Sequence, residues 1–461
     1  MAHYIFVILT LLCSTQLLAQ TSDEDALFIK EIHDHTLTQA HAYDWLTHLS
    51  EKIGGRLAGS AGADEAVKYT EGVMQGMKLD DVSLQPCTVK EWHRNGEAVV
   101  DIVGDGDPIA LTALALGNSV GTAAEGLTAE VIEVTSLDEV HELGREGVEG
   151  KIVFYNRPMD PTQLRTFNAY GGAVDQRVWG ASTAAQYGGL AAVVRSMTLS
   201  LDDVPHTGTL AYKEEFTKVP GIAISTMDAN MLSTMIAKST VKLHVKTACS
   251  PGEEKQSYNV IGEIKGSKYP EEIILVGGHL DSWDVGGGAH DDGAGCVHSL
   301  QVLQTLMALD YKPQRTIRCV MFMNEENGLA GAKEYAKASN EAGEYHMAAI
   351  ESDAGGFVPR GFSFDADTSV LKQHYAAVTD WLPLLESYGL QFTTGGSGAD
   401  INPLKSQKGI LVGLRPDSQR YFDYHHTSVD RIEAVNKREL ELGAAAMTSL
   451  VYLFDKYGLS R

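Results

Sequence analysis

The feature that most constrains this chain is an alternation of apolar runs and amphipathic stretches after Ser257. Short runs rich in Ile, Val and Leu predict buried strands, and the stretches between them have helical spacing of apolar residues. The predicted strands are Ile273–His279, Thr316–Asn324, Ala348–Ser352 and Gly409–Leu414, and the predicted helices are Asp292–Leu309, Gly328–Ser339, Ser369–Tyr388 and Val435–Tyr457. Near-continuous apolar strands that alternate with helices indicate an α/β fold, with a largely parallel mixed sheet covered by helices.

Acidic residues and histidines follow each of these predicted strands. The groups are His279, Asp281, Asp291 and Asp292, then Asn324–Asn327, then Glu351–Gly356, then Tyr424–Thr427 with Asp430. Any one group alone is typical of a polar loop or of a helix N-terminus. Open α/β sheets bind ligands at the carboxyl ends of their strands, so the four groups together predict one site at this edge.

The longest of these segments is Gly277–Cys296, which reads GGHLDSWDVGGGAHDDGAGC. Its glycines let the main chain fold closely around a bound ion. Oxygen and nitrogen donors without cysteine fit hydrolytic zinc, with cobalt and manganese as alternatives. Three carboxylates against two divalent ions leave one net positive charge, which a hydroxide neutralises. The composition of the site therefore favours a pair of metal ions, which suits hydrolysis.

Several motifs resemble one family of zinc exopeptidases, which includes bacterial leucyl aminopeptidases, glutamate carboxypeptidase, glutaminyl cyclases and carboxypeptidase Q. The motifs are the segment above, MNEENGLAGA at 323–332, ESDAGG at 351–356, YHHTSVD at 424–430 and Arg56–Ser60. The sequence that begins at His279 is most similar to the carboxypeptidase Q branch. The resemblance covers nearly all of the mature chain and implies the zinc exopeptidase fold.

The resemblance also implies a role for each motif residue. The implied metal ligands are His279, Asp291, Glu326, Asp353 and His426, which hold two Zn²⁺ ions with Asp291 as the bridge. Glu325 is the implied general base, and Asp281 the acid that orients His279. Either His425 or His426 fills the last position, and His426 is preferred because it directly precedes a threonine. A cis peptide bond between Asp291 and Asp292 is a further expectation.

The middle of the chain has a different sequence pattern, with short segments of β-forming residues and few candidate catalytic or metal-binding residues. Residues 120–249 are predicted to form an inserted β-rich domain, between the catalytic segments 20–119 and 250–461. Gly147–Pro158, Ala184–Ser196 and Val219–Ser225 are similar to a protease-associated insert. The ends of an inserted domain must lie close together in space.

Residues 1–19 are typical of a secretory signal peptide, with an apolar run at Tyr4–Leu12 and a small residue, Ala19, before the cleavage point. The sequence therefore predicts a secreted or periplasmic protein without stable membrane insertion. Four cysteines remain after cleavage, and their spacing does not give a pairing. A net charge of −24 argues against nucleic acid as a partner, because phosphate binding needs clustered Lys and Arg.

The predicted activity is exopeptidase hydrolysis of dipeptides or short peptides. Two alternatives are a glutaminyl-cyclase-type acyltransferase with a single zinc, and a binding homologue that has lost catalysis. The sequence does not distinguish amino- from carboxypeptidase specificity. Thr393–Asp400 and Arg415–Tyr421 are expected to line the specificity region, where Arg415 or Arg420 is a candidate partner for a substrate carboxylate. The resemblance to carboxypeptidase Q favours a homodimer, and Asp284 has no assigned role.

Overall fold

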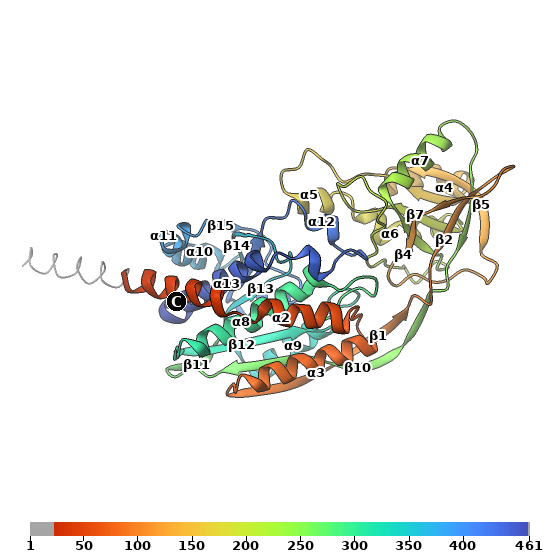
Figure 1. Cartoon of the computed structure of the whole chain (residues 1–461). Coiled ribbons are helices and arrows are strands. Elements are labelled where there is room, and N and C mark those ends of the chain that lie inside the picture. The colour runs from red at the N-terminus through yellow and green to blue at the C-terminus, as the bar shows by residue number, and fades with distance from the viewer. Residues whose placement is uncertain (1–22, 460–461) are drawn as a thin grey trace, which may run out of the picture.

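The computed structural model describes residues 23–459, so the predicted signal peptide lies outside the described part of the chain. Two eight-stranded sheets form two lobes that a long two-stranded ribbon connects (Figure 1). The helices are residues 23–39, α2 (Ala42–Thr47), η1 (His48–Ile53), α3 (Ala61–Gly76), α4 (Leu137–Val148), α5 (Thr166–Gly171), α6 (Asp175–Gln186), α7 (Thr226–Ile236), η2 (Ala289–Gly293), α8 (Ala294–Ala308), α9 (Ala330–Ala342), α10 (Leu371–Thr379), α11 (Leu382–Glu386), η3 (Asn402–Gln407), α12 (Tyr421–Tyr424), η4 (Ile432–Ala434) and α13 (Lys437–Tyr457). Within residues 23–459, none of these helices combines the length and apolarity that a bilayer crossing requires.

The larger sheet has the strand order β1-β10-β12-β11-β13-β16-β14-β15. Its strands are β1 (Asp81–His93), β10 (Ser250–Ile264), β11 (Tyr269–His279), β12 (Arg315–Phe322), β13 (Tyr345–Glu351), β14 (Pro359–Asp365), β15 (Gln391–Thr394) and β16 (Ile410–Pro416). The central strands β12, β11, β13 and β16 are parallel, whereas β10 and β14 join them antiparallel. The predicted α/β class with a mixed sheet is confirmed, and its four predicted strands form the parallel centre.

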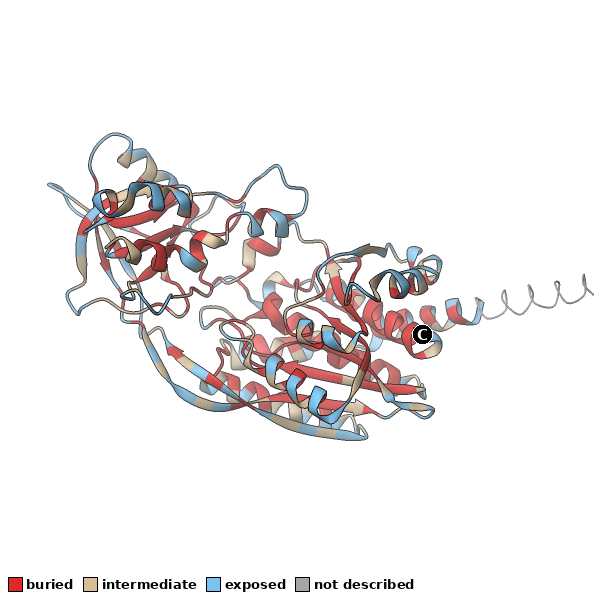
Figure 2. Cartoon of the chain, turned by 180° about the vertical axis from the view of Figure 1, so that it is seen from behind, coloured by how far each residue is buried: buried red, intermediate tan, exposed pale blue. Residues whose placement is uncertain are grey.

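Helices cover both faces of this sheet, which explains why its central strands are apolar throughout. Along β11, Ile274 and Val276 face the core formed with α8 and α13, whereas Leu275 faces the core formed with α9. This alternation follows from the two-residue period of a strand. Figure 2 shows the buried strands enclosed by helices whose outer faces are exposed. The edge left for a ligand is therefore the carboxyl end of the strands.

The predicted helix Ser369–Tyr388 is wrong in one respect, because the structure divides it into α10 and α11. The second piece begins at Leu382 with Pro383 in its first turn. Proline lacks the main-chain N–H that an uninterrupted helix needs at this position, but the first turn of a new helix tolerates it. The break turns the chain toward β15, a short strand beside β14.

The smaller sheet has the order β3-β2-β9-β5-β6-β7-β8-β4, with parallel pairing from β5 through β8. Its strands are β2 (Val99–Val103), β3 (Ile109–Leu111), β4 (Ala113–Ala115), β5 (Leu127–Val134), β6 (Ile152–Tyr155), β7 (Ala191–Arg195), β8 (Gly221–Ile224) and β9 (Lys242–Lys246). The chain enters this lobe from β1 and leaves it through β10, where His93 is paired with Ser250. The sheet thus includes residues 99–115, which precede the predicted boundary at 120.

The lobes also touch through the segment that follows β16. Phe357, Tyr421 and Phe422 of the larger lobe belong to the same apolar cluster as the helix-covered face of the smaller sheet. On the other side of the contact, Phe167 of α5 stacks on Tyr421, with ring centroids 5.3 Å apart. Figure 1 shows α5 and α12 between the two lobes. The loop after α12 is therefore held by both lobes.

Candidate metal centre

The four predicted groups of polar residues converge at one edge of the larger sheet. His279 is the last residue of β11, and Glu325 and Glu326 follow β12. Asp353 follows β13, and His426 follows β16 through the short helix α12. Because these four strands are adjacent and parallel, their carboxyl ends bring the side chains together.

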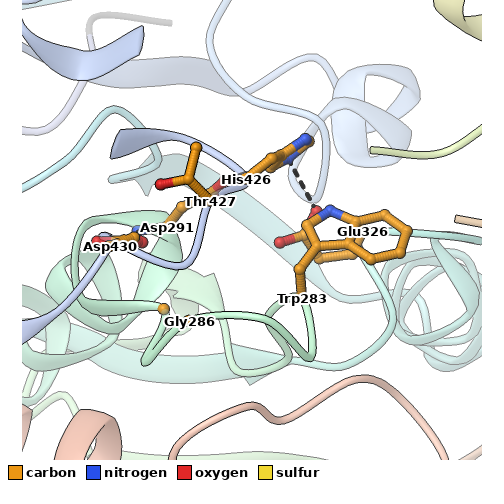
Figure 3. A pocket seen from close by; sticks show the side chains of 8 residues that line it. Trp283, Gly286, Asp291, Glu326, His426, Thr427 and Asp430 are labelled. Atoms are coloured by element: carbon orange, nitrogen blue, oxygen red, sulfur yellow. Dashed lines mark hydrogen bonds and ion pairs between the residues drawn. The ribbon is translucent and has the colours of Figure 1, made fainter. Parts of the chain in front are cut away.

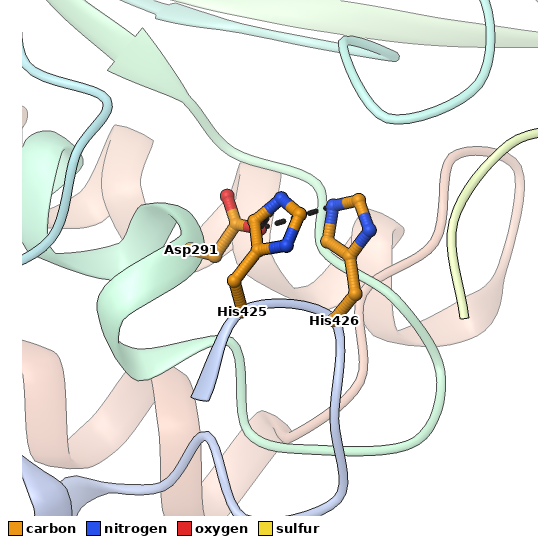
Figure 4. A group of neighbouring side chains, drawn as sticks. All are labelled: Asp291, His425 and His426. Carbon is orange, nitrogen blue, oxygen red and sulfur yellow. Dashed lines mark ion pairs between the residues drawn. The ribbon is translucent and has the colours of Figure 1, made fainter. Parts of the chain in front are cut away.

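Asp291 lies at the middle of this group. Its Oδ1 is 3.3 Å from Nε2 of His279, and its Oδ2 is 3.2 Å from Nε2 of His426. The carboxylate is 5% exposed and thus faces two imidazoles with different oxygens. Figure 4 shows Asp291 directed at the paired histidine rings. This is the arrangement that a carboxylate bridging two cations requires.

Each half of the site contains a further carboxylate. Oδ1 of Asp353 is 3.7 Å from Nε2 of His279, and Oε2 of Glu326 is 3.1 Å from Nε2 of His426. The latter contact appears in Figure 3. We call the two groups the His279 half-site (His279, Asp353 and Asp291 Oδ1) and the His426 half-site (His426, Glu326 and Asp291 Oδ2).

The donors fit divalent metal ions, and zinc in particular. Imidazole nitrogen and carboxylate oxygen are ordinary zinc ligands. Oε1 of Glu326 is buried without a hydrogen-bond donor among residues 23–459, and a buried carboxylate oxygen is costly unless a cation or donor faces it. His279, Asp291 and Glu326 each present a ligand atom within 4.8 Å of the others, as do Asp291, His425 and His426. The electrostatic field of the site therefore favours positive charge.

His425 and His426 have different surroundings although their rings stack 3.5 Å apart. His426 contacts both Asp291 and Glu326, whereas Nε2 of His425 reaches only Asp291, at 3.7 Å. Burial lowers the pKa of His425 well below its usual range. Burial also opposes charge on His426, but the carboxylates of Glu326 and Asp291 more than offset it and raise the pKa of His426 to about 10. The surroundings of His426 therefore stabilise positive charge, whereas those of His425 do not.

Main-chain contacts fix the orientation of His279 and of the turn that contains Glu325. Nδ1 of His279 is 2.9 Å from the main-chain carbonyl of Asp281, while the Asp281 carboxylate lies farther away, at 3.9 Å. That carboxylate accepts hydrogen bonds from the main-chain N–H groups of Asn324, at 2.6 Å, and Glu325, at 3.0 Å. Asp281 thus orients the imidazole through its carbonyl oxygen and the Glu325 turn through its side chain.

Hydrogen bonds also fix the main chain of the segment that contains Asp291. The peptide bond between Asp291 and Asp292 is cis, as expected. Asp292 accepts a hydrogen bond from the main-chain N–H of His279 at 3.0 Å, and Asp430 accepts one from that of Asp291 at 3.1 Å. His290 does not point at the metal donors, because its ring stacks on Phe357 with centroids 4.2 Å apart. The supporting role of Asp430 was not predicted from the sequence.

Arg56, in the N-terminal motif, supports the glycine-rich loop from inside. The side chain is fully buried, and its guanidinium donates to the carbonyls of Leu280, Gly54, Gly287 and Gly288 at 2.6–3.2 Å. Carbonyl acceptors compensate for the loss of water around this cation. The RLAGS motif therefore supports the glycine-rich loop through Arg56 and does not supply a metal donor.

Glu325 lies in the turn after β12, beside the His279 half-site. Burial, together with the neighbouring carboxylates of Asp353 and Glu326, raises the pKa of Glu325 well above its ordinary value. A carboxylate with a raised pKa holds a proton more strongly, which suits a general base. Its main-chain hydrogen bond to Asp281 fixes the turn that presents it.

The two candidate arginines of the predicted specificity region are already occupied. Arg415 is bound to Ser363 Oγ at 2.7 Å and to the carbonyl of Gly396, so it anchors the loop before Asp400. Arg420 is exposed and donates to the hydroxyl of Tyr424. Asp284 forms an ion pair with Arg94, with Nη2 and Oδ1 2.6 Å apart. Both arginines thus have partners within residues 23–459, and their role toward a substrate stays a prediction.

The smaller lobe contributes contacts that the sequence did not reveal. The main-chain N–H of Thr207 donates to the carbonyl of His426 at 3.0 Å, and Nδ1 of His426 is 3.3 Å from the carbonyl of Thr207. Arg177 of α6 packs against the same segment at Gly208. Threonine, glycine and arginine occur in any sequence, and no spacing marks these three as neighbours of His426.

The fold and site together define a metal-dependent hydrolase. The family model described as peptidase family M28 matches residues 259–451. Carboxypeptidase Q of Bos taurus is 34% identical over 418 residues, which cover 90% of this chain and 85% of that protein. The chain therefore belongs to peptidase family M28 and is a zinc metallopeptidase.

Solved structures agree with this assignment. The peptidase M28 precursor from Shewanella amazonensis is 31% identical and has a TM-score of 0.89, with coverage of 95% of this chain and 99% of that chain. A zinc aminopeptidase from Bacillus subtilis is 22% identical with a TM-score of 0.63, over 90% of this chain and 94% of that one. The similarity to the Bacillus subtilis enzyme shows a shared fold.

Proposed function

We propose that this protein is an exported exopeptidase that hydrolyses dipeptides or short peptides with two zinc ions. The observation that carries the proposal is the placement of the two Asp291 oxygens, each facing a different histidine. His279, Asp353 and Asp291 would hold one ion, and His426, Glu326 and Asp291 the other. The curated relative described above is named carboxypeptidase Q, which agrees with an exopeptidase.

When bound, the zinc ions supply Lewis-acid activation of water and of the scissile carbonyl. Glu325 takes the proton of the attacking water at its carboxylate and passes it to the leaving amine. Asp281 holds the Glu325 turn through two main-chain N–H groups, so the base keeps one position during both transfers. Asp430 holds the main chain at His290 and Asp291, and Asp292 holds that of His279 at the end of β11.

Three further assignments are part of the proposal. The smaller lobe corresponds to a protease-associated insert, the signal peptide at residues 1–19 directs export, and the enzyme acts as a homodimer. The pairing of His93 with Ser250 supports the first, because it brings the two ends of the lobe together. Size measurement on the purified protein and N-terminal sequencing of the exported form test the other two.

The central experiment replaces Glu325 with Gln, which preserves the shape of the side chain but removes the base. We expect bound zinc to stay at the wild-type level while kcat for a dipeptide falls about 10³-fold. Glu334→Gln, on the exposed side of α9, is the matched control and should retain full activity. Near-normal turnover in the Glu325 variant would refute the assignment of the base.

Metal stoichiometry separates this proposal from the single-zinc acyltransferase. Two zinc ions per chain, measured by elemental analysis of the active protein, support a dinuclear peptidase, and one tightly bound ion favours the alternative. Assays with an unblocked dipeptide, its N-acylated form and its C-terminal amide complete the test. Hydrolysis of none of the three would exclude an exopeptidase.

A further inference from the structure

Two arginines are buried beside the metal centre, and their surroundings differ. Arg56 donates to four main-chain carbonyls, as described above. Arg177, on the first turn of α6, is 6% exposed, and its Nε and Nη1 are buried without a hydrogen-bond partner among residues 23–459. No ion pair joins Arg177 to a carboxylate within that part of the chain. The smaller lobe therefore places a buried cation with two unpartnered nitrogens beside the centre.

The position of Arg177 is fixed by its neighbours. The guanidinium lies over the ring of Tyr170, 5.5 Å from its centroid, and Tyr170 in turn packs edge-on against His425. A Cβ atom added at Gly208 would be 2.6 Å from Cζ of Arg177 and 2.7 Å from Nδ1 of His426. The guanidinium and the His426 ring thus both border the space that a side chain at position 208 would fill.

A buried guanidinium without acceptors is unfavourable, and the deficit is removed when an anion binds. The planar fork of N–H donors matches the two oxygens of a carboxylate. We propose that Arg177 binds the free C-terminal carboxylate of the peptide substrate. This inference rests on the proposed peptidase function and gives it an end specificity, which is that of a carboxypeptidase or dipeptidase.

The distance along a peptide is consistent with this role. In a substrate cleaved next to its last residue, the terminal carboxylate is one residue from the scissile bond, and consecutive Cα atoms are about 3.8 Å apart. A carboxylate held by Arg177 therefore belongs to a residue beside the His426 half-site. A free amino terminus is repelled from the same position, because Arg177 is cationic.

The first test compares a dipeptide with its C-terminal amide on the zinc-loaded wild-type enzyme. We expect kcat/KM for the free acid to exceed that for the amide about 100-fold, mainly through KM, which is the scale of a buried charge-assisted pair. In Arg177→Gln this preference should disappear, because activity on the acid falls while activity on the amide stays. Arg177→Lys keeps the charge without the fork and should give an intermediate ratio.

The matched control is Arg195→Gln, which removes an arginine of the same lobe that is bound to Asn156 and Asn230. Its ratio of acid to amide should equal that of the wild type. Activity of Arg177→Gln on the amide also shows that the variant is folded. If that variant does not fold, the wild-type ratio and Arg177→Lys decide the question.

A second readout does not depend on turnover. In the Glu325→Gln background with zinc bound, calorimetry should show that the dipeptide acid binds about 100-fold more tightly than its amide, and that adding Arg177→Gln removes the difference. Equal loss on acid and amide in Arg177→Gln would show a structural role, and a wild-type ratio near one would overturn the proposal. Failure of the wild type to cleave either substrate would instead overturn the proposed peptidase function.

Discussion

The two half-sites of the metal centre are built differently. In the His279 half-site, His279 ends β11 and Asp353 follows the neighbouring strand β13, so both side chains extend from the rigid centre of the sheet. In the His426 half-site, His426 lies on a loop after α12 with a left-handed φ of 63°. The smaller lobe holds this loop through Thr207.

Because of this difference, we expect the smaller lobe to affect one half-site more than the other. Among the described residues, the sheet holds one set of donors without contact from the smaller lobe, whereas the other set includes His426, which Thr207 of the smaller lobe contacts. Groups that support a metal ligand commonly change metal affinity by about 10–100-fold. We therefore expect the ion of the His426 half-site to be the more weakly held of the two.

The largest effect should come from Asp291, the residue that the two half-sites share. Asp291→Ala removes one oxygen from each half-site, so we expect loss of both ions and a fall in kcat/KM of at least about 10³-fold, since metal assistance contributes several kcal/mol to hydrolysis. Elemental analysis and a dipeptide assay check this. The control, Glu341→Ala on an exposed position of α9, should keep both ions and full activity. Retention of one tightly bound ion by Asp291→Ala would show that the carboxylate is not shared.

A chelator titration tests whether the half-sites differ in strength. We expect the wild-type protein to release zinc in two steps whose dissociation constants differ about 10–100-fold. His426→Ala should remove the weaker step and keep the stronger one, whereas His279→Ala should remove the stronger step. A single step for both ions would contradict the difference between the half-sites.

The sequence predicted the larger lobe better than the smaller one, for a physical reason. His279, Glu325, Asp353 and His426 follow apolar strands, and parallel strands bring such residues to one edge whatever the details of packing. The choice between His425 and His426 was harder from spacing alone, because it depends on which ring reaches Glu326. The contact of His426 with Glu326 is a property of the folded loop, which spacing does not encode.

The contribution of the smaller lobe could not be predicted in the same way. Thr207 acts through its main-chain N–H and carbonyl, and Gly208 acts through the side chain that it lacks. Main-chain groups are the same in every residue, so a sequence does not mark the ones that support a metal ligand. The predicted lobe boundary at 120 was also drawn without the short strands β2, β3 and β4, which are too brief to give a clear period.

Gly208 offers a third and smaller test of the dependence on the second lobe. It has a φ of +131°, and a Cβ there would press on both Arg177 and His426. We expect Gly208→Ala to weaken the His426 ion about tenfold and to leave the His279 ion unchanged. Gly144→Ala is the matched control, because Gly144 also has a positive φ of +56° in the smaller lobe but no atom within 4 Å of the added Cβ. An equal effect of both variants would indicate general strain in the lobe.

The smallest effect should come from the ion pair between Arg94 and Asp284. Arg94 also donates to the carbonyl of Ala115 and lies 3.5 Å from Oγ1 of Thr207, so it links the β11 loop to the segment that holds His426. Arg94 is largely buried, with 11% of its side chain exposed against 31% for Asp284, whereas the similar pair Arg360–Asp417 has exposures of 62% and 37% and lies within the larger lobe.

A double-mutant cycle with Arg94→Gln and Asp284→Asn should therefore give a coupling free energy of about 1 kcal/mol, and the same cycle at Arg360 and Asp417 a value near zero. Only the first pair should also change zinc affinity at the His426 half-site, by about threefold, because only that pair acts through Thr207. Denaturant unfolding gives the coupling and the chelator titration gives the affinity. Equal coupling at the two pairs, without a change in zinc binding, would mean that the lobes meet at the metal centre without setting its strength.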